Sequence, residues 1–486
     1  MSAGVREMAL SQLLAGIARP AVDVRVADLC LDSRQCRPGS LFIARAGGRE
    51  HGLSHLDDAV ARGAVAVLHD GTQSVPAACP VPLVEIAEIS SCLPELARRF
   101  WGSPEDLDLI AVTGTNGKTS LAWLLASALD GVMFGTLGLG RPGHQVAGTL
   151  TTPDVLSVYR GLASARDQGA AVVVLEASSH ALAQGRLAGL AFSSVIFTGL
   201  GHDHLDYHHS LEAYFEAKSR LFTDYPSRRC IINLDDPYGR ELAARLGNQE
   251  PVLGYSLGER EAAVGRIAAR RLDLTGILAT ARLPGGSLEL SSCLIGRTNL
   301  HNLAIVALDL HARGVERSEI SERISALTPV PGRMQTMRDA RGRCAVIDYA
   351  HTPDTLERLL ASLRELTPGR LLCVFGCGGD RDASKRAPMG RVAEALADQV
   401  ILTDDNPRSE DGTAIIRDIQ TGMGQPERSR VIRDRAAAIA AALAEAMPGD
   451  LVVVAGKGHE TEQWIGDQCR SHSDEAVVRK VFEVAA

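Results

Sequence analysis

One unit recurs along this sequence and restricts its possible folds: a short β-branched apolar run, a Gly-rich or polar turn, and an amphipathic helix. The run Leu109–Thr113 precedes the helical segment Lys118–Leu129, and Val346–Tyr349 precedes Asp354–Leu363 in the same way. Strands that alternate with helices predict parallel, doubly wound sheets covered by helices. Because such sheets bind ligands at the carboxyl ends of their strands, we look for site residues there.

Further buried strands are expected where other short apolar runs end in polar or Gly-rich segments. These runs are Val172–Leu175, Val195–Thr198, Cys230–Leu234, Leu371–Phe375, Val400–Thr403 and Leu451–Ala455. A polar, Pro-containing stretch near 99–108 and the run TPVPG at 328–332 indicate two boundaries. The sequence therefore predicts an α/β protein of three domains: a smaller N-terminal α/β domain (1–100), a central domain with a P-loop-type, mostly parallel sheet flanked by helices (101–331), and a Rossmann-like C-terminal domain (332–486).

Composition excludes several classes of protein. The 486 residues are 45% hydrophobic and 23% charged, which is typical of a globular protein. A net charge of -8 gives no general affinity for nucleic acid or anionic lipid. The sequence shows neither a signal-peptide pattern nor an apolar run near the roughly 20 residues that span a bilayer. We expect a cytoplasmic protein without membrane insertion. Its 10 cysteines show no paired C-x2-C zinc spacing, and we interpret them as ordinary reduced, structural cysteines.

Residues 109–120 read LIAVTGTNGKTS and place a Gly-rich loop between a strand and a helix. Gly114 and Gly117 would let backbone amides approach phosphates, Lys118 would hold the β- and γ-phosphates, and the Thr119 hydroxyl would ligate Mg²⁺. The strict G-x4-G-K-[ST] pattern fails because Val112 occupies its first position, and a simple strand–helix turn is the alternative. The predicted phosphate-binding residues are Gly114, Thr115, Asn116, Gly117, Lys118, Thr119 and Ser120.

Three further segments carry candidate catalytic or metal-binding side chains. Glu176 follows a strand in EASSHAL, His204 lies in GHDHLDYHH, and Lys218 lies in the helix-like EAYFEAKSRLF. Singly, they could be a helix-cap partner, part of a solvated loop and a surface charge. A structural zinc site is not expected, because the segments contain no cysteine and no H-E-x-x-H pattern.

Taken together, these segments resemble the central domain of the Mur ligase family, whose GTNGKT-type loop is shared with folylpolyglutamate synthetases. Both families activate a carboxylate as an acyl phosphate and couple it to an amine. The resemblance implies ATP, two Mg²⁺ ions and the catalytic residues Lys118, Glu176, His204 and Lys218. Thr119 and Glu176 would ligate one ion, and His204 and a side-chain-carbamylated Lys218 the other, since a carbamate presents anionic oxygens. His202 stands where the family often has arginine.

The resemblance continues into segments that would contact the nucleotide. Asn299 and Asn302 in GRTNLHNL would contact the adenine, although asparagines at a helix start are usually caps. Arg333 in PGRMQ, and Asp348 and His351 in IDYAHTPD, would reach ATP from the third domain. Domain closure would then keep an acyl phosphate from water.

Two groups of residues resemble the family's substrate contacts. The segment LDSRQCRPGSLFIA at 31–44 is similar to the first-domain motif that holds the uridine nucleotide, with Ser33 and Arg34 as candidates. Hydroxyls, an amide and a guanidinium suit an anionic, sugar-linked peptide. The positions that match the family's muramoyl-dipeptide contacts are Thr151, Thr152, Ser178, Gln184 and Arg186.

The loops GDRD (379–382), DNPR (405–408) and GKGHE (456–460) follow three strands and could meet in one pocket. In the family, such loops read the amino acid. Arg408 would offer a planar fork to the distal carboxylate of meso-diaminopimelate, and Glu460 would accept from its ammonium group. The alternative for DNPR is a turn with a solvated arginine. The implied amino-acid site is Arg381, Asp405, Asn406, Arg408, Gly456 and Glu460.

The resemblance implies an enzyme that uses ATP to add meso-diaminopimelate to the D-glutamate γ-carboxylate of UDP-N-acetylmuramoyl-L-alanyl-D-glutamate, in cytoplasmic peptidoglycan precursor synthesis. It also implies a monomer. The alternatives are a lysine-adding relative, a folylpolyglutamate synthetase, and a nucleotide-binding scaffold without catalysis. The synthetase predicts neither DNPR nor the DSR–PGxLF segment, and the scaffold predicts loss of Lys118, Glu176, His204 or Lys218, all of which are present.

Overall fold

The computed structural model describes residues 6–47, 50–76, 78–146, 148, 150–247 and 251–484. The chain divides into two compact units, Met1–Gly254 and Tyr255–Ala486, and each is described by itself. No helix in the described ranges combines the length and the apolar character needed to cross a bilayer.

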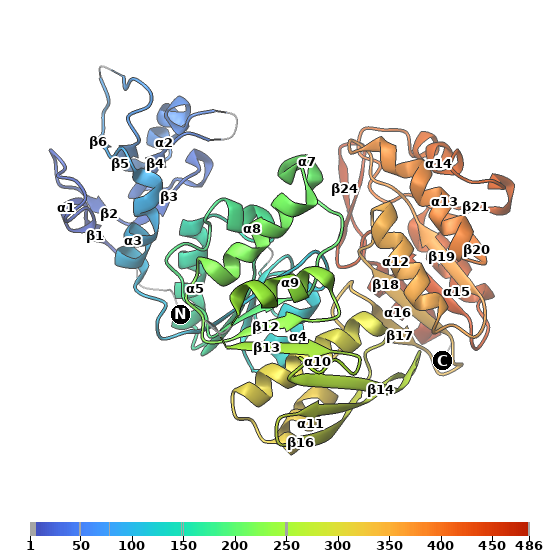
Figure 1. Cartoon of the computed structure of the whole chain (residues 1–486). Helices are drawn as coiled ribbons and strands as arrows, with labels where there is room; N and C mark the ends of the chain where they lie inside the picture. Colours follow the sequence, from blue (N-terminus) through green and yellow to red (C-terminus); the bar gives the residue numbers. More distant parts are fainter. Residues whose placement is uncertain are drawn as a thin grey trace. The chain divides into compact units, whose positions relative to one another are not determined.

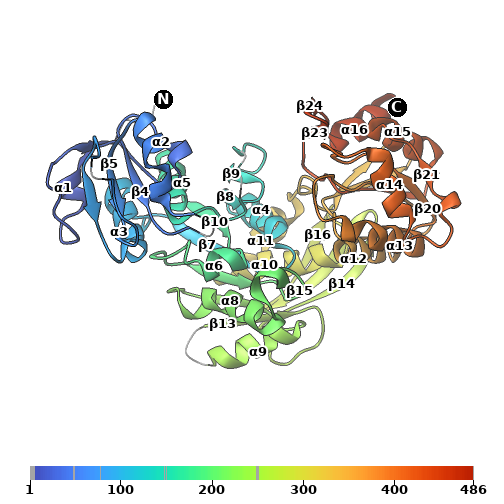
Figure 2. The same ribbon diagram turned by 90° about the horizontal axis from the view of Figure 1, so that it is seen from above.

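The first unit begins with a parallel sheet in the order β3-β4-β5-β6. One face of this sheet packs against α2 through a cluster that includes Phe42, Leu56 and Val67. Helix α3 contacts α5 of the following sheet (Figure 2). The elements are β1 (Met8–Ala9), α1 (Leu10–Leu13), β2 (Arg25–Val26), β3 (Asp28–Cys30), β4 (Ser40–Ala44), α2 (Leu56–Ala61), β5 (Ala64–His69), β6 (Leu83–Glu85) and α3 (Ile89–Trp101).

The second sheet of this unit has the order β12-β11-β7-β10-β8-β9 and is parallel except for β9. Its register pairs Val112 with Glu176 and Thr113 with Phe197, so β7, β10 and β11 end at the same edge. The strands are β7 (Asp108–Thr113), β8 (Val132–Gly135), β9 (Gly138–Gly140), β10 (Val172–Glu176), β11 (Ser194–Phe197) and β12 (Cys230–Asn233). The helices are α4 (Lys118–Ala128), α5 (Val155–Asp167), α6 (Ser179–Ala183), α7 (Leu205–His208), α8 (Leu211–Thr223) and α9 (Pro237–Leu246).

The second unit opens with strands that were not predicted from the sequence. Strands β14 (Gly265–Asp273), β15 (Gly276–Leu283) and β16 (Gly286–Ser292) form an antiparallel meander. Strand β13 (Val252–Ser256) begins in the first unit, and its last two residues pair in parallel with β14. Exposed and buried residues alternate along β16, as expected for a sheet with one solvated face. Helices α10 (Arg297–Ala312) and α11 (Arg317–Ser325) follow.

The C-terminal sheet has the order β17-β18-β22-β19-β20-β21 and is parallel except for β17 (Figure 1). Helices α12, α13 and α14 pack on one face, and α15 and α16 on the other. The strands are β17 (Gln335–Arg338), β18 (Cys344–Asp348), β19 (Leu371–Phe375), β20 (Gln399–Leu402), β21 (Arg430–Val431) and β22 (Leu451–Ala455), with a separate hairpin of β23 (Glu462–Ile465) and β24 (Gln468–Ser471). The helices are α12 (Pro353–Arg364), α13 (Arg386–Leu396), α14 (Gly412–Gln420), α15 (Arg435–Glu445) and α16 (Asp474–Val484).

Every strand expected from the sequence is present, with ends that differ by at most about two residues. The α/β class with mostly parallel sheets flanked by helices is therefore confirmed. The boundary between the two compact units falls inside the segment 101–331. The division into three domains at 100 and 331 stays a prediction.

Candidate active site

The Gly-rich loop has a backbone that only glycine tolerates at its first position. Gly114 has a φ of +147°, and a Cβ atom there would lie 1.9 Å from Thr198 Oγ1. Gly117, with a φ of +83°, is the N-cap of α4. Lys118 Nζ donates to the Gly114 carbonyl at 2.8 Å and to the Thr115 carbonyl at 3.0 Å. The loop thus places a lysine and the amides of a helix N-terminus together, which suits a phosphate.

The rest of the loop is held from neighbouring strand ends. Thr198 Oγ1 donates to the Asn116 carbonyl at 2.6 Å, and the Thr115 amide donates to the Gly199 carbonyl at 2.9 Å. Ser120 lies in the first turn of α4. All seven predicted loop residues therefore lie between the carboxyl end of β7 and the first turn of α4.

Glu176 lies at the end of β10 and is buried, with 1% of its surface exposed. Thr119 Oγ1 donates to Glu176 Oε2 at 2.8 Å, and the Thr136 amide donates to Oε1 at 2.7 Å. A Cβ atom at Gly135 would lie 2.1 Å from Oε1, so the carboxylate needs a glycine beside it. A hydroxyl and a carboxylate in contact are hard oxygen donors of the kind that Mg²⁺ prefers.

Lys218 on α8 reaches the same loop from the opposite side. Its side chain is 1% exposed, and Nζ donates to the Gly114 carbonyl at 2.8 Å and lies 4.4 Å from the centre of the Tyr214 ring. Burial, together with the charge of Lys118, holds the pKa of the Lys218 amine well below its usual range. A neutral amine is the form that reacts with carbon dioxide to give a carbamate.

His204 belongs to a cluster of rings beside Lys218. Its ring centre lies 4.8 Å from that of His180 on α6, and His180 lies 5.5 Å from His208. Burial lowers the pKa of all three imidazoles, and the nearby positive charge of Lys218 adds to this effect. Neutral imidazole is the form that binds metal ions. His180 was not predicted, although it stands in the segment EASSHAL.

Within the described ranges, no group of three or more His, Cys, Asp and Glu side chains is arranged to hold a metal ion. The residues nevertheless fit Mg²⁺, which usually takes one or two carboxylates and completes its shell with phosphate oxygens and water. Thr119 and Glu176 supply a hydroxyl and a carboxylate. Lys218 fits a second ion only as a carbamate, because an ammonium group has no lone pair to donate.

The five residues predicted to hold the dipeptide lie together next to Glu176. Thr152 Oγ1 donates to the Glu176 carbonyl at 2.6 Å and accepts from the Ser178 amide at 3.1 Å. Arg186 donates to the Thr152 carbonyl at 2.6 Å and to Gln184 Oε1 at 2.7 Å. Thr151 contacts Thr136, whose amide binds Glu176, through their hydroxyls at 3.0 Å.

Ser33 and Arg34 lie in a 3-10 turn, Ser33–Gln35, between β3 and β4. Ser33 is buried, whereas the Arg34 side chain is 80% exposed and forms an ion pair with Asp32 at 2.7 Å. In the part of the chain that the structure describes, no hydrogen bond joins either residue to the Thr152 group. Their predicted role in holding the uridine nucleotide remains a prediction.

In the second unit, the predicted adenine contacts occupy the first turns of α10. Asn299 Nδ2 donates to the Ile295 carbonyl at 2.9 Å, and Asn302 Nδ2 donates to Asn299 Oδ1 at 3.1 Å. Both side chains are buried. The N-cap of α10 is Gly296, without a side-chain cap hydrogen bond, so the alternative interpretation of these asparagines as caps is wrong. The adenine contact stays a prediction.

Arg333, Asp348 and His351 meet around Tyr349 at the end of β18. The Arg333 guanidinium lies over the Tyr349 ring at 4.6 Å, and the Met334 amide donates to Asp348 Oδ2 at 2.8 Å. The pKa of the Asp348 carboxyl is raised by burial, and that of His351 is lowered by burial. His459 packs against Tyr349 at 5.3 Å, and burial lowers its pKa to about 4. Neither Tyr349 nor His459 was predicted to have a role.

The three loops predicted to read the amino acid do converge at one edge of the C-terminal sheet. Arg408 Nη1 donates to the Gly379 carbonyl at 2.7 Å, which joins the loops after β20 and β19. Asn406 Nδ2 donates to Glu460 Oε2 at 3.0 Å, which joins the loops after β20 and β22. A Cβ atom at Gly456 would lie 2.6 Å from Asp405 Oδ2, so this carboxylate needs glycine beside it.

Arg381 and Arg408 flank the same glycine. A Cβ atom at Gly378 would lie 3.7 Å from Arg381 Cγ and 3.1 Å from Arg408 Nη1. The non-glycine Arg408 has a φ of +53°, a conformation found more often at functional sites than elsewhere. The Arg408 guanidinium group and the stem of the Arg381 side chain thus lie at one glycine-rich corner, and a guanidinium group suits a carboxylate.

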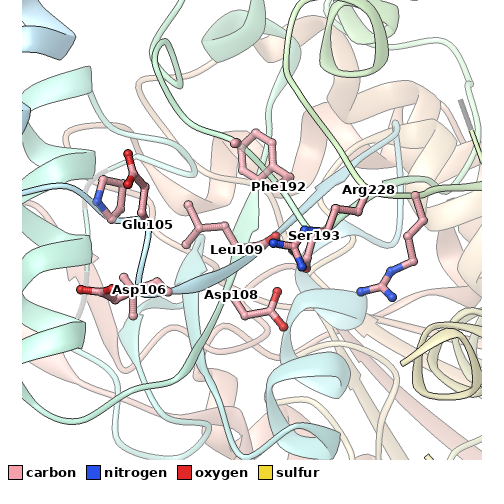
Figure 3. A pocket seen from close by; sticks show the side chains of 11 residues that line it. Glu105, Asp106, Asp108, Leu109, Phe192, Ser193 and Arg228 are labelled. Carbon is pink, nitrogen blue, oxygen red and sulfur yellow. Dashed lines mark hydrogen bonds between the residues drawn. The ribbon is translucent and has the colours of Figure 1, made fainter. Parts of the chain in front are cut away.

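A pocket of about 370 Å³ lies elsewhere on the first unit (Figure 3). It is lined by residues around the start of β7, such as Glu105 and Asp108, and by residues around Phe192 and Arg228. These segments precede β7, β11 and β12, whereas the Gly-rich loop follows β7. The pocket is therefore at the amino-terminal edge of the sheet and separate from the candidate active site.

Comparison with known families matches two domains of this chain. Residues 112–309 match the Mur ligase middle domain. Residues 332–458 match the Mur ligase glutamate ligase domain.

Similarity to individual proteins extends over nearly the whole length. The chain is 44% identical over 486 residues to the UDP-N-acetylmuramoyl-L-alanyl-D-glutamate–2,6-diaminopimelate ligase of Xanthomonas campestris, with 98% of each protein covered. It is 44% identical over 476 residues to the Pseudomonas aeruginosa protein of the same name, with 96% of each covered. A solved structure of a ligase with that name aligns with a TM-score of 0.69 and 35% identity over 95% of each chain. The chain belongs to the Mur ligase family.

Proposed function

We propose that this protein uses ATP to join meso-diaminopimelate to the D-glutamate γ-carboxylate of UDP-N-acetylmuramoyl-L-alanyl-D-glutamate. The full-length relatives at 44% identity carry the name of this activity. One structural observation supports it above the others: Glu176 contacts both predicted substrate sites of the first unit. Its carboxylate accepts from Thr119 of the nucleotide loop, and its main-chain carbonyl accepts from Thr152 of the dipeptide group.

The chemistry requires two transfers. The γ-carboxylate attacks the γ-phosphorus of ATP, and ADP leaves, which gives an acyl phosphate. The amine of diaminopimelate then attacks the acyl carbon, and the tetrahedral intermediate expels phosphate and loses a proton to form the amide. Lys118 and the α4 amides would stabilise the transferring phosphoryl group, since such enzymes act mostly by positioning and charge neutralisation.

Magnesium, when bound, would neutralise charge on the phosphates and on the incoming carboxylate. Thr119 and Glu176 would hold one ion, and His204 with a carbamylated Lys218 would hold the other. The lowered pKa of the buried Lys218 amine supports the carbamate. A charged ammonium group in that position would lack an anionic partner at hydrogen-bond distance in the described ranges.

Amino-acid selection would fall to the corner where Arg381 and Arg408 flank Gly378. L-Lysine lacks the distal carboxylate of diaminopimelate, so its complex would leave these guanidinium groups without a carboxylate to bind. Asp405 and Glu460 supply carboxylate oxygens as acceptors for an ammonium group, and Asn406 donates to Glu460. The arrangement favours diaminopimelate over the lysine-adding alternative.

The remaining residues have roles within the same proposal. Ser33 and Arg34 would bind the uridine nucleotide, and Asn299, Asn302, Arg333, Asp348 and His351 would bind ATP. We propose that the protein acts in the cytoplasm in peptidoglycan precursor synthesis, as a monomer, without binding nucleic acid. A molar mass from light scattering would test the monomer.

The test is ATP-dependent product formation with the UDP-muramoyl-dipeptide and one of three additions: meso-diaminopimelate, L-lysine or no amino acid. We expect amide product and equimolar phosphate with diaminopimelate alone. Equal rates of product formation with L-lysine and with meso-diaminopimelate would favour the lysine-adding alternative. Activity with a folate and glutamate, or no product in any reaction, would favour the synthetase or the non-catalytic scaffold.

A further inference from the structure

Lys457 lies in GKGHE, one of the loops predicted to read the amino acid, and contacts the neighbouring loop DNPR, yet it is not one of the predicted site residues. It follows β22 and is fully buried, with 0% of its surface exposed. Nζ donates to Glu460 Oε2 at 2.8 Å and to Asn406 Oδ1 at 3.1 Å. Because a buried ammonium group is costly unless it is paired, these two contacts account for a lysine at this position.

The same network fixes the orientation of the Asn406 amide. Oδ1 accepts from Lys457 Nζ and also from the Trp464 amide at 3.0 Å, and both groups can only donate. The Nδ2 group must therefore face the other way, where it donates to Glu460 Oε2 at 3.0 Å. One oxygen of Glu460 thus receives two hydrogen bonds from the protein.

The β23–β24 hairpin holds this arrangement from a second side. Gln463 Nε2 donates to the Asp405 carbonyl at 2.8 Å, and the Arg408 amide donates to the Trp464 carbonyl at 3.1 Å. The backbone of 405–408 is therefore tied to β23. The side chain of Glu460, in contrast to the buried Lys457, keeps 34% of its surface exposed. Lys457 and Asn406 bind its Oε2, and Oε1 is the other oxygen.

We propose that Lys457 is a positioning residue that turns Oε1 of Glu460 toward the ammonium group of the amino-acid substrate that does not react. The proposal rests on the proposed function, since it concerns the same amino-acid site. Lys457 holds Oε2 and the Asn406 amide, and it also offsets the negative charge that Glu460 and the buried Asp405 bring to the loops. Without Lys457, Glu460 Oε2 would keep only the hydrogen bond from Asn406, and Asn406 Oδ1 would lose one of its two donors, so the carboxylate would be less firmly oriented.

The test compares two amino acids that differ by one amine. 2-Aminopimelate keeps the reacting amine and both carboxylates of meso-diaminopimelate but lacks the second ammonium group. In Lys457→Met, we expect the KM for diaminopimelate to rise about tenfold, as for loss of one charged hydrogen bond, while the KM for 2-aminopimelate and for ATP changes by less than about twofold. Lys480→Met, on the exposed surface of α16, is the matched control.

A double-mutant cycle separates positioning from a purely structural ion pair. If Lys457 acts through Glu460, Lys457→Met in a Glu460→Gln background raises the KM for diaminopimelate by less than about twofold further. Equal effects of Lys457→Met on both amino acids, no effect on either, or full additivity with Glu460→Gln would overturn the proposal.

Two further outcomes are distinguishable. If wild type forms no product with diaminopimelate, the proposed function itself fails. If Lys457→Met does not fold, Lys457→Arg, which keeps the charge and several donors, replaces it. Lys457→Arg is expected to keep at least about half of the wild-type preference for diaminopimelate over 2-aminopimelate. Complete loss of that preference in a folded Lys457→Arg protein, with Glu460→Gln retaining it, would contradict the positioning role.

Discussion

Lys118 and Lys218 donate hydrogen bonds to the same atom, the carbonyl oxygen of Gly114, each at 2.8 Å. Two ammonium groups at one acceptor repel each other, and burial acts on Lys218 in the same direction. We expect Lys118 to hold phosphate as a cation, whereas Lys218 is the amine that is easily neutralised. The two lysines thus meet at one carbonyl of the Gly-rich loop, and the proposed roles of cation and carbamate would separate their charges.

Replacing Lys218 tests the modification. We expect Lys218→Met to lower kcat about 100- to 1,000-fold, as for loss of one group that stabilises the transition state. After incubation with ¹³C-bicarbonate, a carbamate carbon signal is expected in wild type and not in the variant. A wild-type protein without this signal that is fully active would exclude the carbamate. Lys480→Met serves as the control for loss of a lysine in general.

Arg408 tests the amino-acid site. We expect Arg408→Ala to raise the KM for meso-diaminopimelate about 100-fold, because the distal carboxylate loses its guanidinium partner in a partly buried corner. The KM for ATP should stay within about twofold of wild type. Steady-state kinetics with both substrates checks this. An unchanged KM for diaminopimelate would assign recognition of the carboxylate to other residues.

Gly114 tests the geometry of the nucleotide loop. A Cβ atom would lie 1.9 Å from Thr198 Oγ1, so Gly114→Ala must displace the loop, and kcat/KM for ATP should fall about 100-fold. Gly169→Ala is the matched control, since Gly169 also has a positive φ, +80°, but a Cβ atom there would meet no atom of the described residues within 4 Å. Similar losses in both variants would mean that backbone strain, and not the contact with Thr198, is responsible.

The buried pair of Arg435 and Asp474 predicts how stability depends on pH. Burial alone would raise the pKa of the Asp474 carboxyl, but the charge of Arg435 and hydrogen bonds from Arg435 and His472 hold it far below its usual range. A carboxyl with a depressed pKa stabilises the fold above its unfolded pKa of about 4, and this stability is lost as pH falls further.

We therefore expect the free energy of unfolding to fall below about pH 4 in wild type, and Asp474→Asn to lose about 3–5 kcal/mol at pH 7 because Arg435 stays buried without its charge partner. Urea unfolding at several pH values measures both. Asp467→Asn is a matched control outside the pair. If wild type and Asp474→Asn lose the same free energy between pH 7 and pH 3, the dependence on pH comes from other carboxyl groups.

The parallel part of the fold was predictable because each strand is a short apolar run that ends in a glycine or polar segment. For example, Leu371–Phe375 and Leu451–Ala455 were predicted with their observed bounds. The meander of β14 to β16 was not predicted. Strand β14 mixes buried and exposed residues without clean alternation, and it contains a register shift at Ala269, so its sequence pattern is weak.

The site residues were predicted by motif, and their contacts were not. Glu176 was expected as a metal ligand, but no pattern in EASSHAL shows that its carbonyl accepts from Thr152. Lys457 lies inside the segment GKGHE, yet its burial and its hydrogen bond to Asn406, 51 residues away in the sequence, could not be read from that segment. Pairings between segments so far apart are set by tertiary structure rather than by local sequence.

Glu176 contacts the nucleotide loop through its side chain and the dipeptide group through its backbone. Glu176 is buried and both of its carboxylate oxygens accept hydrogen bonds, so its side-chain torsions are restrained and the two contacts move together. An attacking carboxylate and a phosphorus atom must be held to within about 0.5 Å of the productive geometry. A single residue that belongs to both contact networks couples the nucleotide loop directly to the dipeptide group. Two independently packed elements would each add their own fluctuation.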